Sequence, residues 1–303
     1  MILAPVIIAT YSRVAHFIKC VESLKKNSLA TETILVVGID YPVKDEHIQA
    51  NENIKDYCRT ITGFKKVIIK EWPENLGPRL NFFRLREIGF TFSNKLILTE
   101  DDNVFHQDFL SYMNHNLDRF ENDETVFSVC GYNYPIDYKN VNSTDNLLLK
   151  AYSAWGVGIW KEKFEHVSFK QGEFQNILKS PYKVLSVAKT LGDHVIQHYL
   201  HAERNKLIYG DTWISLYLYQ YNKYSIFPAK TLVENIGNDG SGINCGIDDK
   251  INNQAMLNVD KVNEVYHVES IYHRQQINDY FKLTLKSKIK LSILLMYNLF
   301  FNK

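Results

Sequence analysis

Short apolar runs alternate with longer stretches of helical periodicity over the first 133 residues. The apolar runs have strand length and lie at 5–9, 33–39, 67–70, 96–98 and 126–131. The helical stretches between and after them lie at 14–24, 45–60, 78–92 and 109–120, and Ser12 is expected to cap the first of these. This alternation predicts a parallel sheet with helical crossovers on its faces.

The second half of the chain departs from this alternation. We expect a loop over 134–146, one helix over 183–205, another over 214–221 and a strand over 228–233. The segment 154–160 combines two tryptophans with two glycines, and two interpretations are open. It is a tight turn with buried tryptophan anchors, or a place where the backbone approaches a flat ligand beside an indole. The glycine-rich segment 235–246 predicts a flexible loop that orders over a ligand, and it is not a Walker loop.

Composition and charge exclude several classes of protein. The 303 residues contain 45% hydrophobic side chains, which suffices for a large core, and the formal net charge of +1 gives no field that favours nucleic acid. The four cysteines, at 20, 58, 130 and 245, have no paired spacing. We therefore expect neither a zinc site nor a disulfide framework, and a reducing compartment. Without a signal-peptide pattern, the expected location is the cytoplasm.

Three consecutive carboxylates, Glu100, Asp101 and Asp102, follow the apolar run at 96–98. Carboxylates this close repel one another, so their placement at the carboxyl end of a central strand requires a nearby cation. A divalent metal that carries a phosphate is one solution, because ligands of open α/β sheets bind at the carboxyl ends of the strands. The alternative is the first turn of a helix that begins near Gln107.

Other polar residues suggest chemistry less directly. Arg79 lies in the first turn of an expected helix, where a cation opposes the helix dipole, and this hints at an anionic ligand. Asp211 is either the N-cap of the helix after it or a carboxylate held in a crevice. His194, His198 and His201 share a helical face, but no further ligand joins them in a recognised spacing, so we expect no metal there.

The C-terminus is basic and then apolar. Lysines at 282, 286, 288 and 290 precede the apolar segment 291–301, and no acidic residue follows Asp279. An apolar segment this short cannot span a bilayer, which takes about 20 residues. Two interpretations remain: an amphipathic helix in the interface of an anionic membrane, or a last helix docked on the core or on a second subunit.

Several spaced motifs together resemble the GT-A fold of nucleotide-sugar glycosyltransferases. The resemblance runs from Pro5 to about Cys245 and is strongest to N-acetylglucosaminyltransferase I and its bacterial relatives. It rests on the first strand with its turn at 10–13, on Asn75-Leu-Gly-Pro-Arg79, on Glu100-Asp101-Asp102, on the Gly/Trp segment 154–160, on Asp211-Thr-Trp213 and on the loop 235–246. In that loop Asn244 stands where the family pattern has His.

The fold that this resemblance implies is an α/β, Rossmann-like one, with a mixed, mainly parallel central sheet flanked by helices. Residues 1–280 would form the glycosyltransferase domain, with a nucleotide-binding half at 1–133 and an acceptor half at 134–280. Residues 281–303 would form a basic amphipathic C-terminal helix. The sequence does not indicate an oligomeric state.

The resemblance also assigns roles to residues. Donor binding falls to Thr10, Arg13, Asp40, Arg79, Glu100 and Asp101. Asp102 would bind Mn²⁺ or Mg²⁺, and Asp211 would be the catalytic base. The sugar and acceptor pocket would contain Trp155, Gly156, Trp213 and Asp239.

The implied activity is an inverting, metal-dependent transfer of a hexosyl or N-acetylhexosaminyl group from a nucleotide-sugar, favoured to be a UDP-sugar. The acceptor would be a glycan or lipid-linked saccharide of bacterial surface polysaccharide synthesis, on the inner face of the cytoplasmic membrane. A sugar nucleotidyltransferase is the first alternative, but segment 10–13 lacks the glycine-rich activating loop expected of one. The second is a catalytically inactive protein that binds a nucleotide-sugar or a glycan.

Overall fold

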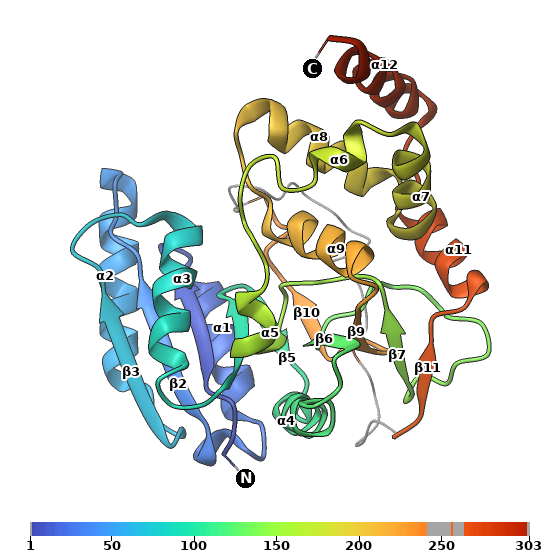
Figure 1. Cartoon of the computed structure of the whole chain (residues 1–303). Coiled ribbons are helices and arrows are strands. Elements are labelled where there is room, and N and C mark those ends of the chain that lie inside the picture. The colour runs from blue at the N-terminus through green and yellow to red at the C-terminus, as the bar shows by residue number, and fades with distance from the viewer. Residues whose placement is uncertain (1, 241–255, 257–263, 302–303) are drawn as a thin grey trace.

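A nine-stranded mixed sheet forms the centre of the protein (Figure 1). The computed structural model describes residues 2–240, 256 and 264–301. In sheet order the strands are β11 (Tyr266–Val268), β7 (Asn146–Leu149), β9 (Tyr224–Pro228), β6 (Val126–Cys130), β8 (Val157–Trp160), β4 (Lys95–Glu100), β1 (Val6–Thr10), β2 (Ile34–Ile39) and β3 (Lys66–Glu71). A separate pair joins β5 (Asn103–Phe105) and β10 (Val233–Asn235).

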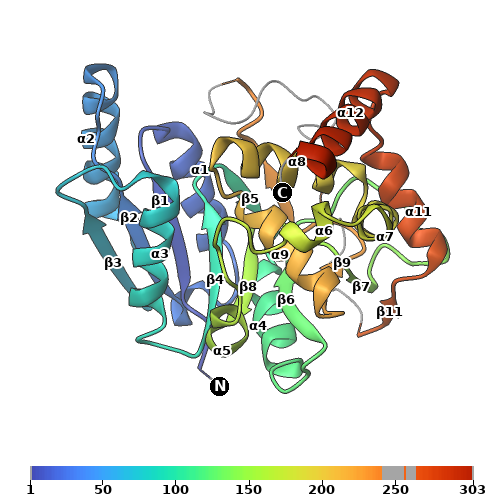
Figure 2. The same cartoon turned by 45° about the horizontal axis from the view of Figure 1, so that its top comes forward.

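The half of the sheet built from the N-terminal residues is parallel, as the alternation predicted. Strands β1, β2, β3 and β4 pair in parallel, and the register places Ala9 opposite both Gly38 and Glu100. Strand β8 lies between β4 and β6 and is antiparallel to both, whereas β9 pairs in parallel with β6. The sheet is thus mixed and mainly parallel, and Figure 2 shows it extending from β3 to β11 across the molecule.

Helices cover both faces of this sheet. In chain order they are α1 (Val14–Lys25), α2 (Asp45–Thr60), α3 (Gly77–Gly89), α4 (Phe109–Arg119), α5 (Lys161–Glu165), α6 (Gln175–Leu178), α7 (Pro181–Leu191), α8 (Asp193–Asn205), α9 (Gly210–Gln220), α11 (Ile271–Tyr280) and α12 (Leu285–Phe301), with a 3₁₀ turn at Ala30–Glu32.

Two hydrophobic cores lie between the sheet and these helices. Because side chains alternate along a strand, Val6 and Ile8 face the core shared with α1, α2 and α4, whereas Ile7 faces the opposite one. That opposite core is shared with α3 and with α5 to α9, and it continues to α11 and α12. A single sheet therefore supports both halves of the chain.

Several expected elements differ from the observed ones. The helix predicted over 183–205 is two helices, because Gly192 with φ 94° separates α7 from α8. The strand predicted over 228–233 is instead the end of β9 and the start of β10. Ser12 does not cap α1, whose N-cap is Arg13 without a capping side chain.

The tryptophan segment contains a turn and a central strand. Gly156 has φ 69°, and its carbonyl oxygen accepts a hydrogen bond from the Gly131 amide at 2.7 Å. A Cβ at Gly156 would lie 3.0 Å from the Phe109 ring, so the turn needs glycine. Residues 157–160 then form β8, which the sequence did not predict.

The C-terminal helix lies at the opposite end of the molecule from the N-terminus (Figure 1). Its Leu291 is buried on the core, and Lys288 forms an ion pair of 2.9 Å with Asp193 of α8. Among the helices that the structure describes, none is both long and apolar enough to cross a bilayer.

Lys163 of α5 holds the turn between α4 and β6. Its ammonium group donates hydrogen bonds to the carbonyl oxygens of Phe120, Asp123 and Val126 at 2.8, 2.8 and 2.9 Å, and it lies 4.0 Å from the centre of the Trp160 ring. Only 7% of this residue is exposed. A side chain without donors would leave buried carbonyl groups without these bonds.

We therefore expect Lys163→Met to lower the free energy of unfolding by about 1–3 kcal/mol. Urea denaturation followed by circular dichroism measures this loss. The control is Lys183→Met, which changes an exposed lysine on α7. Equal stability of the two variants would contradict the role given to the Lys163 hydrogen bonds.

Candidate active site

The acidic triplet lies in the turn between β4 and β5. Glu100 is the last residue of β4, and Asp101 and Asp102 form the turn before Asn103 begins β5. The alternative, a helix start, is therefore wrong, because α4 begins only at Phe109. Strand β1 ends beside this turn, and the Thr10 hydroxyl donates a hydrogen bond of 2.8 Å to Asp101 Oδ2.

Arg13 provides the cation that the adjacent carboxylates require. One terminal nitrogen of its guanidinium group lies 2.6 Å from Asp101 Oδ1 and 2.8 Å from Asp102 Oδ2. Burial acts to lower the pKa of Arg13, but the two carboxylates outweigh burial and raise it. Burial is also the main cause of a raised pKa at Asp101, against which the charge of Arg13 acts.

The segment after β10 closes over Asp102. The Asn235 side-chain amide donates a hydrogen bond of 2.9 Å to Asp102 Oδ1, and the Ile236 amide donates one of 2.8 Å to the Asp102 carbonyl oxygen. A Cβ at Gly237 would clash with the Asp102 carboxylate, so only glycine fits here. The first residues of the predicted glycine-rich loop thus belong to the site, whereas 241–246 lie outside the described residues.

Asp40 holds the N-terminus of α3. Its Oδ1 accepts hydrogen bonds from the amides of Leu76 at 2.7 Å and Tyr41 at 3.0 Å, and its Oδ2 accepts one from Gly77 at 2.8 Å. These bonds position the Asn75-Leu-Gly turn and the start of the helix that carries Arg79. Asp40 therefore has a clear positioning function in this loop.

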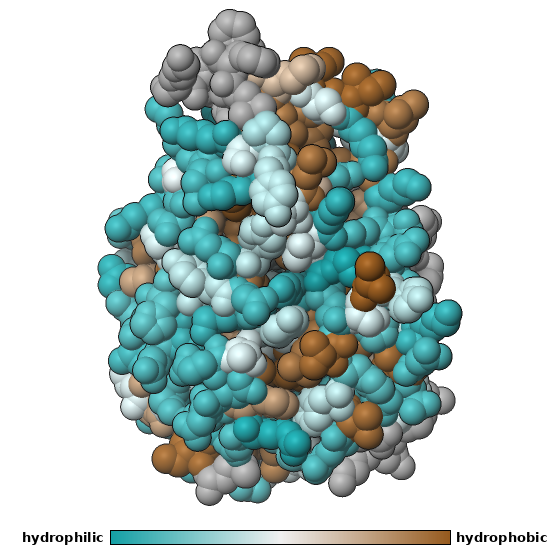
Figure 3. Space-filling view, turned by 45° about the vertical axis from the view of Figure 1, so that its right-hand side comes forward, coloured by the Kyte–Doolittle hydropathy of each residue, from teal (hydrophilic) through white to brown (hydrophobic). Residues whose placement is uncertain are grey.

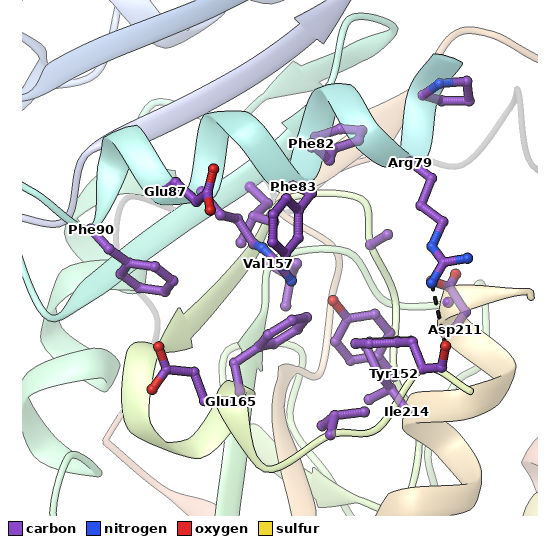
Figure 4. Close-up of a pocket in the computed structure, with 18 of the residues that line it drawn as sticks. Arg79, Phe82, Phe83, Glu87, Phe90, Tyr152, Val157, Glu165, Asp211 and Ile214 are labelled. Atoms are coloured by element: carbon purple, nitrogen blue, oxygen red, sulfur yellow. Dashed lines mark hydrogen bonds between the residues drawn. The ribbon is translucent and has the colours of Figure 1, made fainter. Parts of the chain in front are cut away.

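A cavity of about 870 Å³ lies beside β4 and β8, between α3 and α9. Figure 4 shows Arg79 and Asp211 at one end of it and Phe90 and Glu165 at the other. Arg79 is exposed and donates a hydrogen bond of 3.4 Å to the Phe169 carbonyl oxygen. Glu100 lines the cavity too, so the acidic triplet adjoins it through this residue.

Asp211 lies in the first turn of α9. The residue reaches solvent, but many protein atoms surround its carboxyl group. This burial raises its pKa to about 6. Asp211 is not the N-cap of α9, a position that belongs to Tyr209. Within the described part of the chain, no residue forms a hydrogen bond or an ion pair with its carboxylate, which is therefore open to a ligand.

Glu100 lies among other carboxyl groups, including Asp211. Burial, followed by the charges of Asp102, Asp211 and Asp101, raises the pKa of Glu100 to about 8. Carboxyl groups whose pKa values are raised by burial and by one another's charge are typical of active sites.

The other residues expected in the sugar pocket do not line this cavity. Trp213 is completely buried, and its indole N–H donates a hydrogen bond of 3.0 Å to the Lys170 carbonyl oxygen. Trp155 packs against Tyr132 with ring centres 4.7 Å apart. Asp239 lies on the α1 side, 3.1 Å from His16 Nε2. Trp213 thus anchors α9, which carries Asp211, and does not face the cavity.

The sequence interpretation missed two residues that line the cavity, Arg86 and Tyr152. Arg86 follows Arg79 by seven residues, and this spacing places both on one face of a helix, so a signal was present. Tyr152 lies in an irregular segment, and its sequence context gave no signal.

Asp102 is the residue that the sequence predicts to hold a metal ion. The described residues contain no cluster of three or more His, Cys, Asp or Glu side chains that could hold a metal ion. On α8, His194 instead stacks on Phe281 at 4.2 Å, and His201 hydrogen-bonds Tyr209 at 2.9 Å. Each carboxylate oxygen of Asp102 has one hydrogen-bond donor near it, which leaves a further lone pair on each. This donor set fits Mg²⁺ or Mn²⁺ held mainly by substrate phosphates and water.

The similarities of this chain to known proteins come from solved structures. No protein-family model and no curated protein sequence matches it. Among solved structures, it is similar to the mannosyltransferase PcManGT from Pyrobaculum calidifontis in complex with GDP-Man and Mn²⁺, with a TM-score of 0.41 and 13% identity over 72% of this chain and 69% of that one.

The chain is also similar to S. aureus TarS, with a TM-score of 0.37 and 16% identity over 65% of this chain and 33% of that one. For TarS residues 1–349 the TM-score is 0.38, again with 16% identity and 65% of this chain, and with 55% of that one. These similarities are weak, and none concerns N-acetylglucosaminyltransferase I specifically.

Proposed function

We propose that the chain is an inverting glycosyltransferase that moves a hexosyl or N-acetylhexosaminyl group from a nucleotide-sugar, a UDP-sugar in the first instance, to a hydroxyl group of a glycan or lipid-linked saccharide. The observation that carries the proposal is the cavity that Glu100 and Asp211 share. These two carboxyl groups, 111 residues apart, meet where parallel strands end, beside the ion pairs of Arg13. The motif resemblance to bacterial surface-polysaccharide enzymes supports it.

The donor would lie over the ends of β1, β2 and β4. Thr10, Arg13 and Asp101, which hydrogen bonds and an ion pair hold together, would form one side of the donor site, and the turn that Asp40 holds would form another. Arg79 is available for the nucleotide or its phosphates. Asp102 would hold a Mn²⁺ or Mg²⁺ ion. Such an ion supplies Lewis-acid stabilisation of the diphosphate as it leaves.

Asp211 would act as the general base. It takes the proton of an acceptor hydroxyl group while that oxygen forms a bond to the anomeric carbon. The bond from that carbon to the diphosphate breaks on the opposite face, and its electron pair leaves with the nucleoside diphosphate, so the configuration inverts. With a pKa of about 6, the Asp211 carboxylate is ionised at neutral pH and remains basic enough to take the proton.

We expect Asp211→Asn to lower kcat at least about a hundredfold, because a positioned base contributes about 10²–10⁴. Donor affinity should be unchanged. In the unmodified protein the base must be ionised, so kcat should fall as the pH drops through about 6. Steady-state kinetics of nucleoside diphosphate release measures both effects.

The control for this variant is Asp239→Asn, which changes a carboxylate outside the cavity. Near-normal turnover by Asp211→Asn would mean that another carboxylate is the base. Release of pyrophosphate in place of nucleoside diphosphate would identify a nucleotidyltransferase, and donor binding without turnover would identify an inactive binding protein.

Asp102→Asn should abolish the metal-dependent part of donor binding and leave the fold intact, because Arg13 keeps its partner Asp101. We expect UDP-sugars with Mn²⁺ to raise the melting temperature of the unmodified protein, since ligands that bind only the folded state stabilise it. The variant should lose this increase and keep its melting temperature without ligand. Full activity of the variant in a chelator would refute the metal assignment.

We propose that α12 contacts an anionic membrane surface, on the inner face of the cytoplasmic membrane. Leu285, Ile289, Ile293 and Met296 form one stripe along α12 and are 75%, 54%, 56% and 53% exposed. Exposed lysines at 282, 286 and 290 accompany the stripe. Figure 3 shows apolar side chains gathered at this end of the molecule. An amphipathic helix with apolar and cationic residues binds such an interface.

The double variant Ile289→Glu, Ile293→Glu should lower binding to phosphatidylserine-containing vesicles at least about tenfold, because it removes two apolar side chains from the interface. Vesicle co-sedimentation measures the binding. Ile48→Glu on α2 changes a similarly exposed isoleucine elsewhere and serves as control. Unchanged sedimentation of the double variant would remove the membrane proposal.

A further inference from the structure

The cavity is longer than the two carboxyl groups at its end require. It follows α3 from Pro78 and Arg79 to Phe90, and Arg86 lies on the same side of the helix as Arg79. Seven residues of α-helix correspond to about 10 Å along its axis. Arg86 is therefore two helical turns from the end where Asp211 and Glu100 lie.

Arg86 is a half-buried cation that forms no ion pair with any described residue, although the charges of Glu87 and Glu165 act on it. Its guanidinium carbon lies 4.4 Å from the centre of the Phe164 ring and 5.2 Å from that of Phe83. Glu87 and Glu165 also line the cavity, but neither forms an ion pair with it, and Glu87 pairs with Arg84 at 3.6 Å instead. Burial lowers the pKa of Arg86, which agrees with its loss of hydration.

The walls around Arg86 are mainly aromatic. The rings that line the cavity belong to Phe82, Phe83, Phe90, Tyr152, Phe164 and Phe169. Aromatic faces pack well against the apolar C–H surface of sugar rings. A guanidinium group held between such rings offers a planar set of donors, which matches a carboxylate or a phosphate through two parallel hydrogen bonds.

We propose that this part of the cavity is an acceptor subsite in which Arg86 binds the anionic group, a carboxylate or a phosphate, of an acidic sugar. That this sugar is the acceptor rests on the proposed function, whereas its binding at Arg86 does not. The two helical turns between Arg79 and Arg86, about 10 Å along α3, leave room for a sugar ring between the anionic group and the reacting hydroxyl.

The test uses the full-length protein and matched probes. Isothermal titration calorimetry compares methyl β-D-glucuronide and glucose 6-phosphate with methyl β-D-glucoside, which lacks the charge. We expect at least one anionic probe to bind about tenfold more tightly than the neutral one. The anionic probe that binds with the higher affinity shows whether the site prefers a carboxylate or a phosphate.

Arg86→Gln should remove this preference and leave the binding of the neutral probe unchanged. The matched control is Arg84→Gln, which changes an exposed arginine of the same helix and should keep the preference. Arg86→Lys retains the charge but not the planar set of donors, so it should keep a reduced preference. This variant also covers the case in which Arg86→Gln fails to fold.

Three results would overturn the inference: equal binding of charged and neutral probes, an equal loss in Arg84→Gln, or full competition by UDP, which would assign Arg86 to the donor. The proposed function fails in a different way. Charge preference without turnover of any nucleotide-sugar would leave the anion site in place and refute the glycosyltransferase.

Discussion

The ion pairs of Arg13 with Asp101 and Asp102 are the interaction on which the rest of the site depends. Two adjacent buried carboxylates repel each other, and burial alone disfavours their charge. The guanidinium group of Arg13, at the N-cap of α1, pairs with both at 2.6 and 2.8 Å and offsets one of the two negative charges. Asp102 also accepts a hydrogen bond from the Asn235 side chain, and the backbone at 237 can lie against its carboxylate because this residue is glycine.

The sheet order explains why residues distant in sequence meet at this point. Strands β1 and β4 are parallel neighbours, so their carboxyl ends bring Thr10 and Glu100 to one edge. Strand β8 pairs with the edge of β4 that faces away from β1. Helix α9 begins on the opposite side of the cavity from α3. The buried indole of Trp213 fixes the start of α9, and with it the position of Asp211.

Much of this could be predicted, because the elements with clear periodicity carry the decisive residues. The strands of the parallel half and helix α2 follow the expected boundaries, and the acidic triplet follows a buried strand as expected. Strand β8 was not predictable, because the segment 154–160, with two glycines and two tryptophans, fits a turn equally well. A tryptophan pattern does not reveal which way an indole points, so the burial of Trp213 was also hidden. The roles assigned by resemblance remain predictions.

The charges along the cavity give it a direction. Asp211 and Arg79 lie at one end, and Arg86 lies about two helical turns, or about 10 Å, further along α3, where Glu87 and Glu165 also line the cavity. In the proposed subsite the anionic group of the sugar would pair with Arg86 and lie away from the Asp211 carboxylate, which would repel it. In this orientation an uncharged hydroxyl group, and not the anionic substituent, lies near Asp211. The same charge separation that selects the ligand would therefore also present the nucleophile to its base.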